Sequence, residues 1–286
     1  MTSVYAEVIG DPIAHSKSPL IHNFWLNKLG IDAEYRATHV LPENLNSFLI
    51  ERNGDDDWRG CNITIPHKRS VLPFLDHLDS SASEVGAVNT VVLRDWYLWG
   101  YNTDTKGFLD PILPMLKADP TYRFASIIGS GGAALAVAKA LRDAGFTLIL
   151  YNRDPDAAWE RLGSLCGDRD LNCDFSELSK RPSRWDVDWK EGPDRLDLIV
   201  NATSLGMVGQ PELKIDFRRF PPASVVYDLV YAPLQTAFLR SAQNCGMRTI
   251  DGLQMLVGQA ALAFELFFGQ PAPRQHDAEL RELLLA

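Results

Sequence analysis

The stretch that decides the fold is FASIIGSGGAALAVAKALRDA, residues 124–144. It opens with a largely apolar run, Phe124 to Ile128, which predicts a buried β-strand. It closes with an alanine-rich segment free of proline, Ala133 to Ala144, which predicts a helix. The residues between them are small and suit a tight turn: Gly129, Ser130, Gly131 and Gly132.

A glycine turn between a strand and a helix is suited to binding a pyrophosphate. Backbone N–H groups can approach the anion closely there, at the positive end of the helix dipole. Gly129 and Gly131 match the first two glycines of the dinucleotide fingerprint, and Ala134 occupies the third position, where alanine is permitted. A purely structural turn is the alternative. Three glycines in four positions favour a nucleotide site from Gly129 to Ala133.

The end of the next strand bears on the choice of cofactor. That strand, Phe146 to Asn152, ends about 20 residues beyond the glycines, where the adenosine ribose is expected. An acidic residue there would accept from the 2′-OH of NAD, whereas Arg153 suits the 2′-phosphate of NADP. Asp154 can compete for the guanidinium, or form an exposed pair with it. The pattern favours NADP and leaves NAD open.

The rest of the chain also predicts α/β structure. Strands alternate with helices, which indicates βαβ units, with a mainly parallel sheet in the first hundred residues and a separate doubly wound unit after them. The expected strands are Tyr5 to Gly10, Asp32 to His39, Cys61 to Ile65, Ala87 to Leu93, Leu196 to Asn201 and Ser224 to Leu229.

Helices and irregular segments complete this prediction. Pro19 to Leu29 and the strongly apolar Gly252 to Gly269 predict helices, and the second of these can return to the first domain. The junction is expected at 102–120, where Asp104 and Thr105 offer N-cap groups to a helix. The polar stretch Cys166 to Arg195 predicts irregular or lightly helical structure, to which we assign no function.

Composition limits the classes of function. A chain of 286 residues with 46% hydrophobic residues fits a globular protein of two domains, and its net charge of −9 argues against a nucleic-acid partner. No apolar run approaches the ~20 residues of a membrane span, and the start lacks a signal-peptide pattern, so we expect a cytoplasmic protein. No metal is expected, because neither the histidines nor the cysteines show the spacing of a metal site. The four cysteines are scattered along the chain, at Cys61, Cys166, Cys173 and Cys245.

Motifs in a fixed order extend the argument beyond the glycine turn. Together with Asn152-Arg153 they resemble the shikimate dehydrogenases, the shikimate/quinate dehydrogenase family, over nearly the whole chain. The segments that carry the resemblance are GDPIAHSKSP (10–19), NITIPHK (62–68), GAVNT (86–90), NTD (102–104), NATSLGM (201–207) and DGLQML (251–256).

This resemblance implies a fold and an activity. Residues 1–104 with 252–286 would form a substrate-binding catalytic domain, and residues 105–251 a Rossmann-like NADP-binding domain, with the active site in a cleft between them. The implied reaction is the NADPH-dependent, reversible reduction of 3-dehydroshikimate to shikimate, a step of chorismate and aromatic amino acid biosynthesis. The implied protein is a monomer or homodimer.

By resemblance, Lys68 and Asp104 are the catalytic pair, and their chemistry agrees. Reducing a ketone builds negative charge on its oxygen, which a cation or acid must stabilise and protonate. Lys68 suits that role, with Asp104 orienting it; the alternatives are a surface lysine and a helix cap. His67 ranks second, because in an extended chain neighbouring side chains point to opposite faces.

The resemblance also implies residues that bind the ligands. Substrate contacts fall on short polar side chains: Ser16 and Ser18 with Tyr231 for the carboxylate, and Thr64, Asn89 and Gln259 for the ring oxygens. Ser16 and Ser18 would alternatively cap the following helix. Cofactor contacts fall on Thr203, Leu205, Leu229, Gly252 and Met255, with Gly252 explained by close passage of the backbone past the nicotinamide or, alternatively, by a turn.

Two other functions stay open from the sequence. A quinate or dual quinate/shikimate dehydrogenase would need room for one more hydroxyl, and the presence of both Ser16 and Ser18 favours shikimate. A nucleotide-binding sensor without catalysis would keep the fold, but the intact Lys68 and Asp104 speak against it. The chain departs from the family at Thr105-Lys106 and at Asp154.

Overall fold

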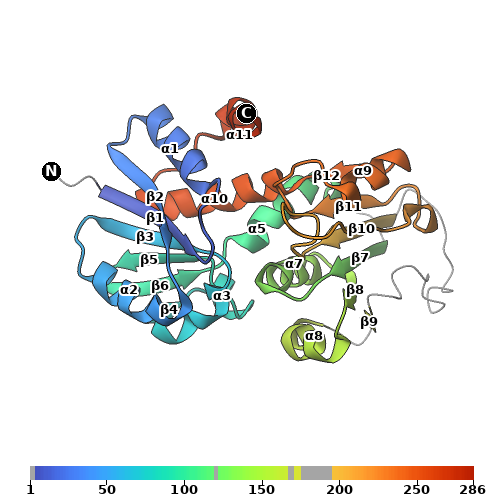
Figure 1. Ribbon diagram of the computed structural model, residues 1–286, viewed down its shortest axis with the longest axis horizontal. Helices are drawn as coiled ribbons and strands as arrows, with labels where there is room; N and C mark the ends of the chain where they lie inside the picture. The colour runs from blue at the N-terminus through green and yellow to red at the C-terminus, as the bar shows by residue number, and fades with distance from the viewer. Residues whose placement is uncertain (1–3, 119–121, 167–170, 175–194) are drawn as a thin grey trace. The chain divides into compact units, whose positions relative to one another are not determined.

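The computed structural model describes residues 4–118, 122–166, 171–174 and 195–286. The chain folds into two compact units, Met1–Gly107 with Leu256–Ala286, and Phe108–Met255 (Figure 1). We call these the first and the second unit. The chain passes between them inside two continuous helices, α5 (Asp104–Leu109) and α10 (Gly252–Phe268).

The first unit contains a mixed sheet with the strand order β2-β1-β3-β5-β6-β4. Strand β1 is parallel to β2 and β3, but β5 is antiparallel to both β3 and β6. Among the described strands of this sheet, three of the five neighbouring pairs are parallel, as the prediction of a mainly parallel sheet expects, and the two pairs that contain β5 are antiparallel. The strands are β1 (Val4–Gly10), β2 (Ala33–His39), β3 (Trp58–Ile63), β4 (His77–Leu78), β5 (Thr90–Arg94) and β6 (Tyr97–Tyr101).

The hairpin between β5 and β6 was missed for a local reason. Its turn consists of Asp95 and Trp96, which both have positive φ, 52° and 68°. Such turns are usually signalled by glycine or asparagine, and Trp96 gives no such signal. The predicted strand Ala87 to Leu93 also begins late, because the backbone N–H of Val88 donates to the carbonyl of Lys68 outside the sheet, at 2.8 Å. Strand β3 likewise ends at Ile63 and not at Ile65.

Helices bury an aromatic core against this sheet. Trp25 and Tyr35 are almost fully buried, and His22 stacks on the ring of Tyr35 with centroids 3.9 Å apart. Asn23, on the same helix α1 as His22 and Trp25, binds the backbone of Tyr35 at the sheet edge. Its side chain donates to the C=O of Tyr35 at 2.8 Å and accepts from the N–H of Tyr35 at 2.9 Å. The helices are α1 (Ser18–Leu29), α2 (Leu45–Asn53), α3 (His67–Ser70), α4 (Ser80–Ser83) and α11 (Asp277–Leu285), with parts of α5 and α10.

The second unit confirms the doubly wound fold. All neighbouring strands of its sheet are parallel, and their order is β12-β11-β10-β7-β8-β9. The order reverses between β7 and β10, and ligands of such folds bind at the carboxyl ends of the strands there. The strands are β7 (Tyr122–Ile128), β8 (Thr147–Asn152), β9 (Leu171–Asp174), β10 (Arg195–Asn201), β11 (Val225–Asp228) and β12 (Arg248–Ile250).

Strand β9 corrects part of the prediction for Cys166 to Arg195. Leu171–Asp174 extends the sheet by pairing in parallel with β8, whereas we expected irregular or lightly helical structure there. Residues 167–170 and 175–194 of that segment lie outside the described residues. The helices of the second unit are α6 (Leu113–Leu116), α7 (Gly132–Asp143), α8 (Pro155–Leu162) and α9 (Ala237–Asn244). Within the described part of the chain, the helices are all too short or too polar to cross a membrane.

Acid should destabilise the protein through His22. Burial lowers the pKa of His22 from 6.5 to about 3, because the apolar surroundings favour the neutral ring. Above pH 6.5 neither state is protonated, and below it the unfolded chain takes up a proton that the folded protein refuses. Between pH 6.5 and about 3, this residue should lower the free energy of unfolding by about 1.4 kcal/mol per pH unit.

Urea unfolding of the wild type and of His22→Phe across this pH range measures the effect. Phenylalanine keeps an aromatic ring against Tyr35 but cannot be protonated, so the variant should gain relative stability as the pH falls. A stability difference that does not change with pH would contradict the prediction.

Candidate active site

Lys68 and Asp104 form a close ion pair in the first unit. The Lys68 Nζ lies 2.5 Å from Asp104 Oδ2, and the two side chains are 16% and 6% exposed. Lys68 is therefore not a solvated surface lysine. A buried pair of this kind is stable only while both partners are present, because removing one leaves an uncompensated charge.

The position of Lys68 follows from the short helix α3. The premise that the chain is extended at His67 and Lys68 is wrong, since α3 begins at His67. His67 is fully buried and its Nε2 lies 2.7 Å from the carbonyl oxygen of Val40. This contact ties His67 to the segment after β2, while the next residue, Lys68, extends towards Asp104.

Asp104 stands at the start of helix α5, but its carboxylate does not cap that helix. The backbone N–H groups of Asp104 and Thr105 both donate to Asn102 Oδ1, at 3.1 and 3.4 Å. The expected N-cap role of Asp104 and Thr105 is thus filled by Asn102. The carboxylate of Asp104 is left for Lys68 and for Asn89.

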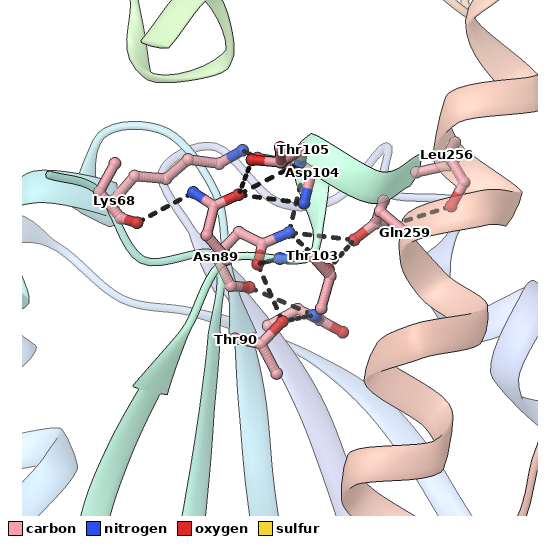
Figure 2. Close-up of polar contacts among 11 residues, drawn as sticks. Lys68, Asn89, Thr90, Thr103, Asp104, Thr105, Leu256 and Gln259 are labelled. Carbon is pink, nitrogen blue, oxygen red and sulfur yellow. Dashed lines mark hydrogen bonds and ion pairs between the residues drawn. The ribbon is translucent and has the colours of Figure 1, made fainter. Parts of the chain in front are cut away.

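Asn89 joins the pair to helix α10 (Figure 2). Its Nδ2 lies 2.9 Å from Asp104 Oδ1, 2.8 Å from Thr103 Oγ1 and 3.3 Å from Gln259 Oε1. Gln259 in turn donates to the carbonyl of Leu256 at 2.9 Å. Four predicted residues, Lys68, Asn89, Asp104 and Gln259, therefore meet in one buried polar cluster.

Close approach of two helices places Gln259 in this cluster. A Cβ on Gly107 of α5 would lie 2.5 Å from the backbone nitrogen of Gln259, and one on Gly258 would lie 3.1 Å from the Cα of Gly107. Only glycines allow α5 and α10 to pass at this distance. The helix that carries Asp104 and the helix that carries Gln259 are thereby held together.

The other predicted substrate residues lie in loops. Thr64, after β3, is half-buried, and its methyl group fills the space beside Gly10 at the end of β1. Ser16 Oγ accepts the backbone N–H of Ser18, the first residue of α1, at 3.3 Å, so Ser16 supports the start of that helix, whereas Lys17 at the N-cap position makes no side-chain cap. Tyr231 belongs to the second unit, where burial raises the pKa of its hydroxyl.

The glycine turn in the second unit has space that no described side chain fills. A Cβ on Gly131 would meet nothing within 4 Å, and its φ of −76° suits any residue. Gly131 also gives helix α7 no side-chain cap, so N–H groups at the helix start are available to a ligand. Gly129 differs, with a φ of 104° and Thr203 Cγ2 2.7 Å from its hypothetical Cβ. The open space at Gly131, beside Ser130, Gly132 and Ala133, fits a pyrophosphate.

The end of β8, where the sequence predicts the adenosine ribose, leaves a buried amide nitrogen unpaired among the described residues. Asn152 is buried, and its Nδ2 has no hydrogen-bond partner among the described residues. Asp154 caps helix α8 by accepting from the N–H of Ala157 at 3.0 Å. Arg153 is exposed and forms no ion pair within the described part of the chain. The expected competition between Asp154 and a phosphate for Arg153 is therefore reduced, because the carboxylate is already engaged as a helix cap.

A second set of predicted cofactor residues follows β10 and β11. Asn201 Oδ1 accepts from both the N–H and the hydroxyl of Thr203, at 3.1 and 2.7 Å. The Nδ2 of Asn201 donates to the buried carboxylate of Asp228 at 2.9 Å, and burial raises the pKa of that carboxyl. Leu205, whose N–H donates to Thr203 Oγ1 at 3.0 Å, is half-buried.

Gly252 has a packing reason within the protein, in addition to its predicted place beside the cofactor. A Cβ there would lie 2.5 Å from the carbonyl oxygen of Leu229 and 2.6 Å from that of Val230, so the protein's own backbone requires glycine. Gly252 begins helix α10, so it is the first residue of the helix and not a turn glycine before it. Met255 is buried one turn further along.

Sequence reasoning gave no role to several residues of the cluster. Thr103, Asn62 and Thr90 lie within the quoted motifs, and all are buried and hydrogen-bonded around Asn89. Their signal was polarity inside or beside apolar strands. Among the described residues, no group of three or more His, Cys, Asp and Glu side chains could hold a metal ion.

Comparison with known proteins agrees with this geometry. The fold consists of two α/β units, one of them Rossmann-like, and relatives that match almost the whole chain identify it as an oxidoreductase. The family model described as the shikimate dehydrogenase substrate binding domain matches residues 8–91, and that of the shikimate 5′-dehydrogenase C-terminal domain matches residues 252–279. A shikimate dehydrogenase (NADP(+)) of Sphingopyxis alaskensis is 46% identical over 287 residues, covering 99% of this chain and 98% of the relative. The chain therefore belongs to the shikimate dehydrogenase family.

Solved structures give the same family and one further activity. Shikimate 5-dehydrogenase from Thermus thermophilus, in complex with NADP(H) and shikimate, is 34% identical with a TM-score of 0.80, over 99% of this chain and 100% of that one. The ligand-free 5-ketofructose reductase of a Gluconobacter strain is 29% identical with a TM-score of 0.80, over 99% of both chains. Proteins with similar folds thus act on different substrates, so the substrate of this protein must be inferred from the residues of its site.

Replacing Gly131 should impair the cofactor without affecting the fold. Alanine there meets nothing within 4 Å of the protein, so Gly131→Ala should keep the wild-type melting temperature but raise the KM for the nucleotide about tenfold or more. Gly60→Ala, outside the proposed cofactor site, is the matched control, since its Cβ would lie 2.2 Å from the carbonyl oxygen of Val91 and should destabilise the protein by about 1–3 kcal/mol. Thermal unfolding and nucleotide titration separate the two. A Gly131→Ala protein with unchanged nucleotide binding would contradict the assignment.

Proposed function

We propose that this protein catalyses the reversible, NADPH-dependent reduction of 3-dehydroshikimate to shikimate. The observation that carries the proposal is the buried Lys68–Asp104 pair with Asn89 and Gln259 beside it. Relatives named as shikimate dehydrogenases match almost the whole chain. We further propose that it acts in the cytoplasm as a monomer or homodimer.

Lys68 and Asp104 supply the acid chemistry in this proposal. The reaction places a hydride on the carbonyl carbon and a proton on the carbonyl oxygen, and bound NADPH supplies the hydride. Lys68 stabilises the charge that develops on the oxygen and donates the proton. Asp104 fixes the ammonium at 2.5 Å and, on the return reaction, favours its reprotonation.

Short neutral groups are proposed to bind the substrate. Asn89 and Gln259 lie beside the ion pair and can bind ring oxygens, together with Thr64. Ser16, Ser18 and Tyr231 are the proposed carboxylate contacts. Hydroxyl and amide groups match a ligand that carries several hydroxyls, since a polar site rejects analogues that leave its groups unpaired.

The second unit is proposed to hold NADP. The open space at Gly131 and the uncapped start of α7 support a pyrophosphate there. Asn152 and Arg153, at the end of β8, are the proposed ribose and 2′-phosphate contacts, with Asp154 shaping the start of α8. Thr203, Leu205, Leu229, Gly252 and Met255 complete the proposed cofactor site.

An absorbance assay of reduced nicotinamide tests the function. The wild type should oxidise shikimate with NADP at a kcat/KM well above the value for quinate, and should not reduce 5-ketofructose efficiently. Lys68→Ala should lower kcat by about a hundredfold or more with a modest change in KM, because the lost interaction belongs to the transition state. Dominant turnover of quinate, or a fully active Lys68→Ala protein, would refute the proposal.

Arg153 should set the preference for NADP over NAD. Arg153→Ala removes the proposed contact between the guanidinium and the 2′-phosphate. It should raise the KM for NADP about tenfold and leave the KM for NAD nearly unchanged. Arg161→Ala, which replaces an exposed arginine in the last turn of helix α8, is the matched control, since that helix begins two residues after Arg153. Equal effects of Arg153→Ala on both cofactors would assign the 2′-phosphate to another group.

A further inference from the structure

We propose that Thr90 is a positioning residue, which keeps the side-chain amide of Asn89 oriented so that it donates to Asp104. Asn62 in turn holds the Thr90 hydroxyl in the orientation that this requires. The part of this proposal that concerns turnover rests on the function proposed above. Thr90, Asn62 and Asn89 are 5% exposed or less. Asn89 is a proposed substrate contact, whereas Asn62 and Thr90 are not proposed to contact substrate or cofactor.

The orientation of Asn89 is fixed by a group that can only donate. The backbone N–H of Thr103 lies 2.8 Å from Asn89 Oδ1, so this atom must be the amide oxygen. The amide nitrogen then faces Asp104 Oδ1 at 2.9 Å, which an ionised carboxylate accepts. The reverse orientation would place the amide oxygen against the carboxylate and two donors against each other.

The direction continues through Thr90 to Asn62. The Thr90 hydroxyl has only one proton, which it donates to Asn89 Oδ1 at 3.0 Å. Its oxygen therefore accepts from Asn62 Nδ2, also at 3.0 Å. The same Nδ2 donates to the backbone carbonyl of Asn89 at 3.2 Å, and because a carbonyl can only accept, the Asn62 amide cannot be reversed.

The chain of donors begins in the aromatic core. The Tyr35 hydroxyl donates to Asn62 Oδ1 at 2.5 Å, and burial raises the pKa of Tyr35, which keeps it a donor. From Tyr35 through Asn62, Thr90 and Asn89 to Asp104, each group donates towards the carboxylate. Hydrogen bonds aligned in one direction in a buried site reinforce one another.

The reaction gives this alignment a purpose. When Lys68 passes its proton to the substrate oxygen, Asp104 loses the cation that compensates its buried charge. The N–H of Asn89 remains as a donor to the carboxylate at that moment. A rigidly oriented Asn89 therefore stabilises the state in which Lys68 is neutral. The Thr90 hydroxyl and the backbone N–H of Thr103 both donate to Asn89 Oδ1, and together they hold the amide in this orientation.

Two substitutions at Thr90 separate hydrogen bonding from packing. Thr90→Val keeps the shape and removes the hydroxyl, whereas Thr90→Ser keeps the hydroxyl and removes a buried methyl group. We expect Thr90→Val to lower kcat about tenfold and Thr90→Ser to stay within about threefold of wild type, with the KM for NADP unchanged in both. If packing alone mattered, serine would be the more harmful change. A Thr90→Val protein as active as Thr90→Ser would overturn the proposal.

Unfolding provides a test that does not depend on turnover. In urea, Thr90→Val should lower the unfolding midpoint more in the wild type than in an Asp104→Asn background, because the oriented donors act on the charge of Asp104. Equal losses in both backgrounds would overturn the proposal whatever the activity. If the wild type fails to turn over shikimate, the proposed function fails, while this coupling still decides the role of Thr90.

Discussion

The buried charge of Asp104 is the constraint on which the first unit depends. The Asp104 side chain is 6% exposed, so its carboxylate persists only if both oxygens are satisfied, and removing the partner of such a charge typically costs about 3–5 kcal/mol. Lys68 satisfies one oxygen and Asn89 the other. The loop before β5, the short helix α3 and the start of α5 must therefore hold their relative positions to within hydrogen-bond distance. Architecture and chemistry share this requirement.

Glycines serve two different purposes in this protein. Gly107 and Gly252 lack side chains because protein backbone occupies the space, so they serve packing. Gly131 lacks one although the space is open and the backbone angle is ordinary, so its reason lies outside the protein. Only the space around each glycine separates these cases, and a sequence motif alone cannot.

The sequence predicted four strands in each unit, and all of them are present, because short apolar runs are local signals. Each unit also contains two strands that were not predicted, β4 and β6 in the first unit and β9 and β12 in the second. The hairpin of β5 and β6 was missed because Trp96 adopts a backbone angle that its type rarely adopts, at a φ of 68°. The strand β9 was missed because its surroundings in sequence are polar, and pairing with β8 outweighs that pattern.

The candidate site was predictable as a set of residues but not as a network. Motif order pointed to Lys68, Asn89 and Asp104, which the fold brings together. The directions of the hydrogen bonds could not be foreseen, since Asn62 and Thr90 act through partners 27 and 28 residues away in the chain. The capping role of Asn102 and the burial of His67 likewise depend on where the chain turns after β3 and β6.

Asn23 has a consequence for how the protein meets other chains. An edge strand normally exposes a row of donors and acceptors that can template a strand from a neighbour. At the middle of β2, one amide side chain imitates such a neighbour by bonding both backbone groups of Tyr35. A strand from another protein molecule would have to break both hydrogen bonds before it could pair with β2. This edge of the sheet is therefore protected against intermolecular strand pairing at high protein concentration.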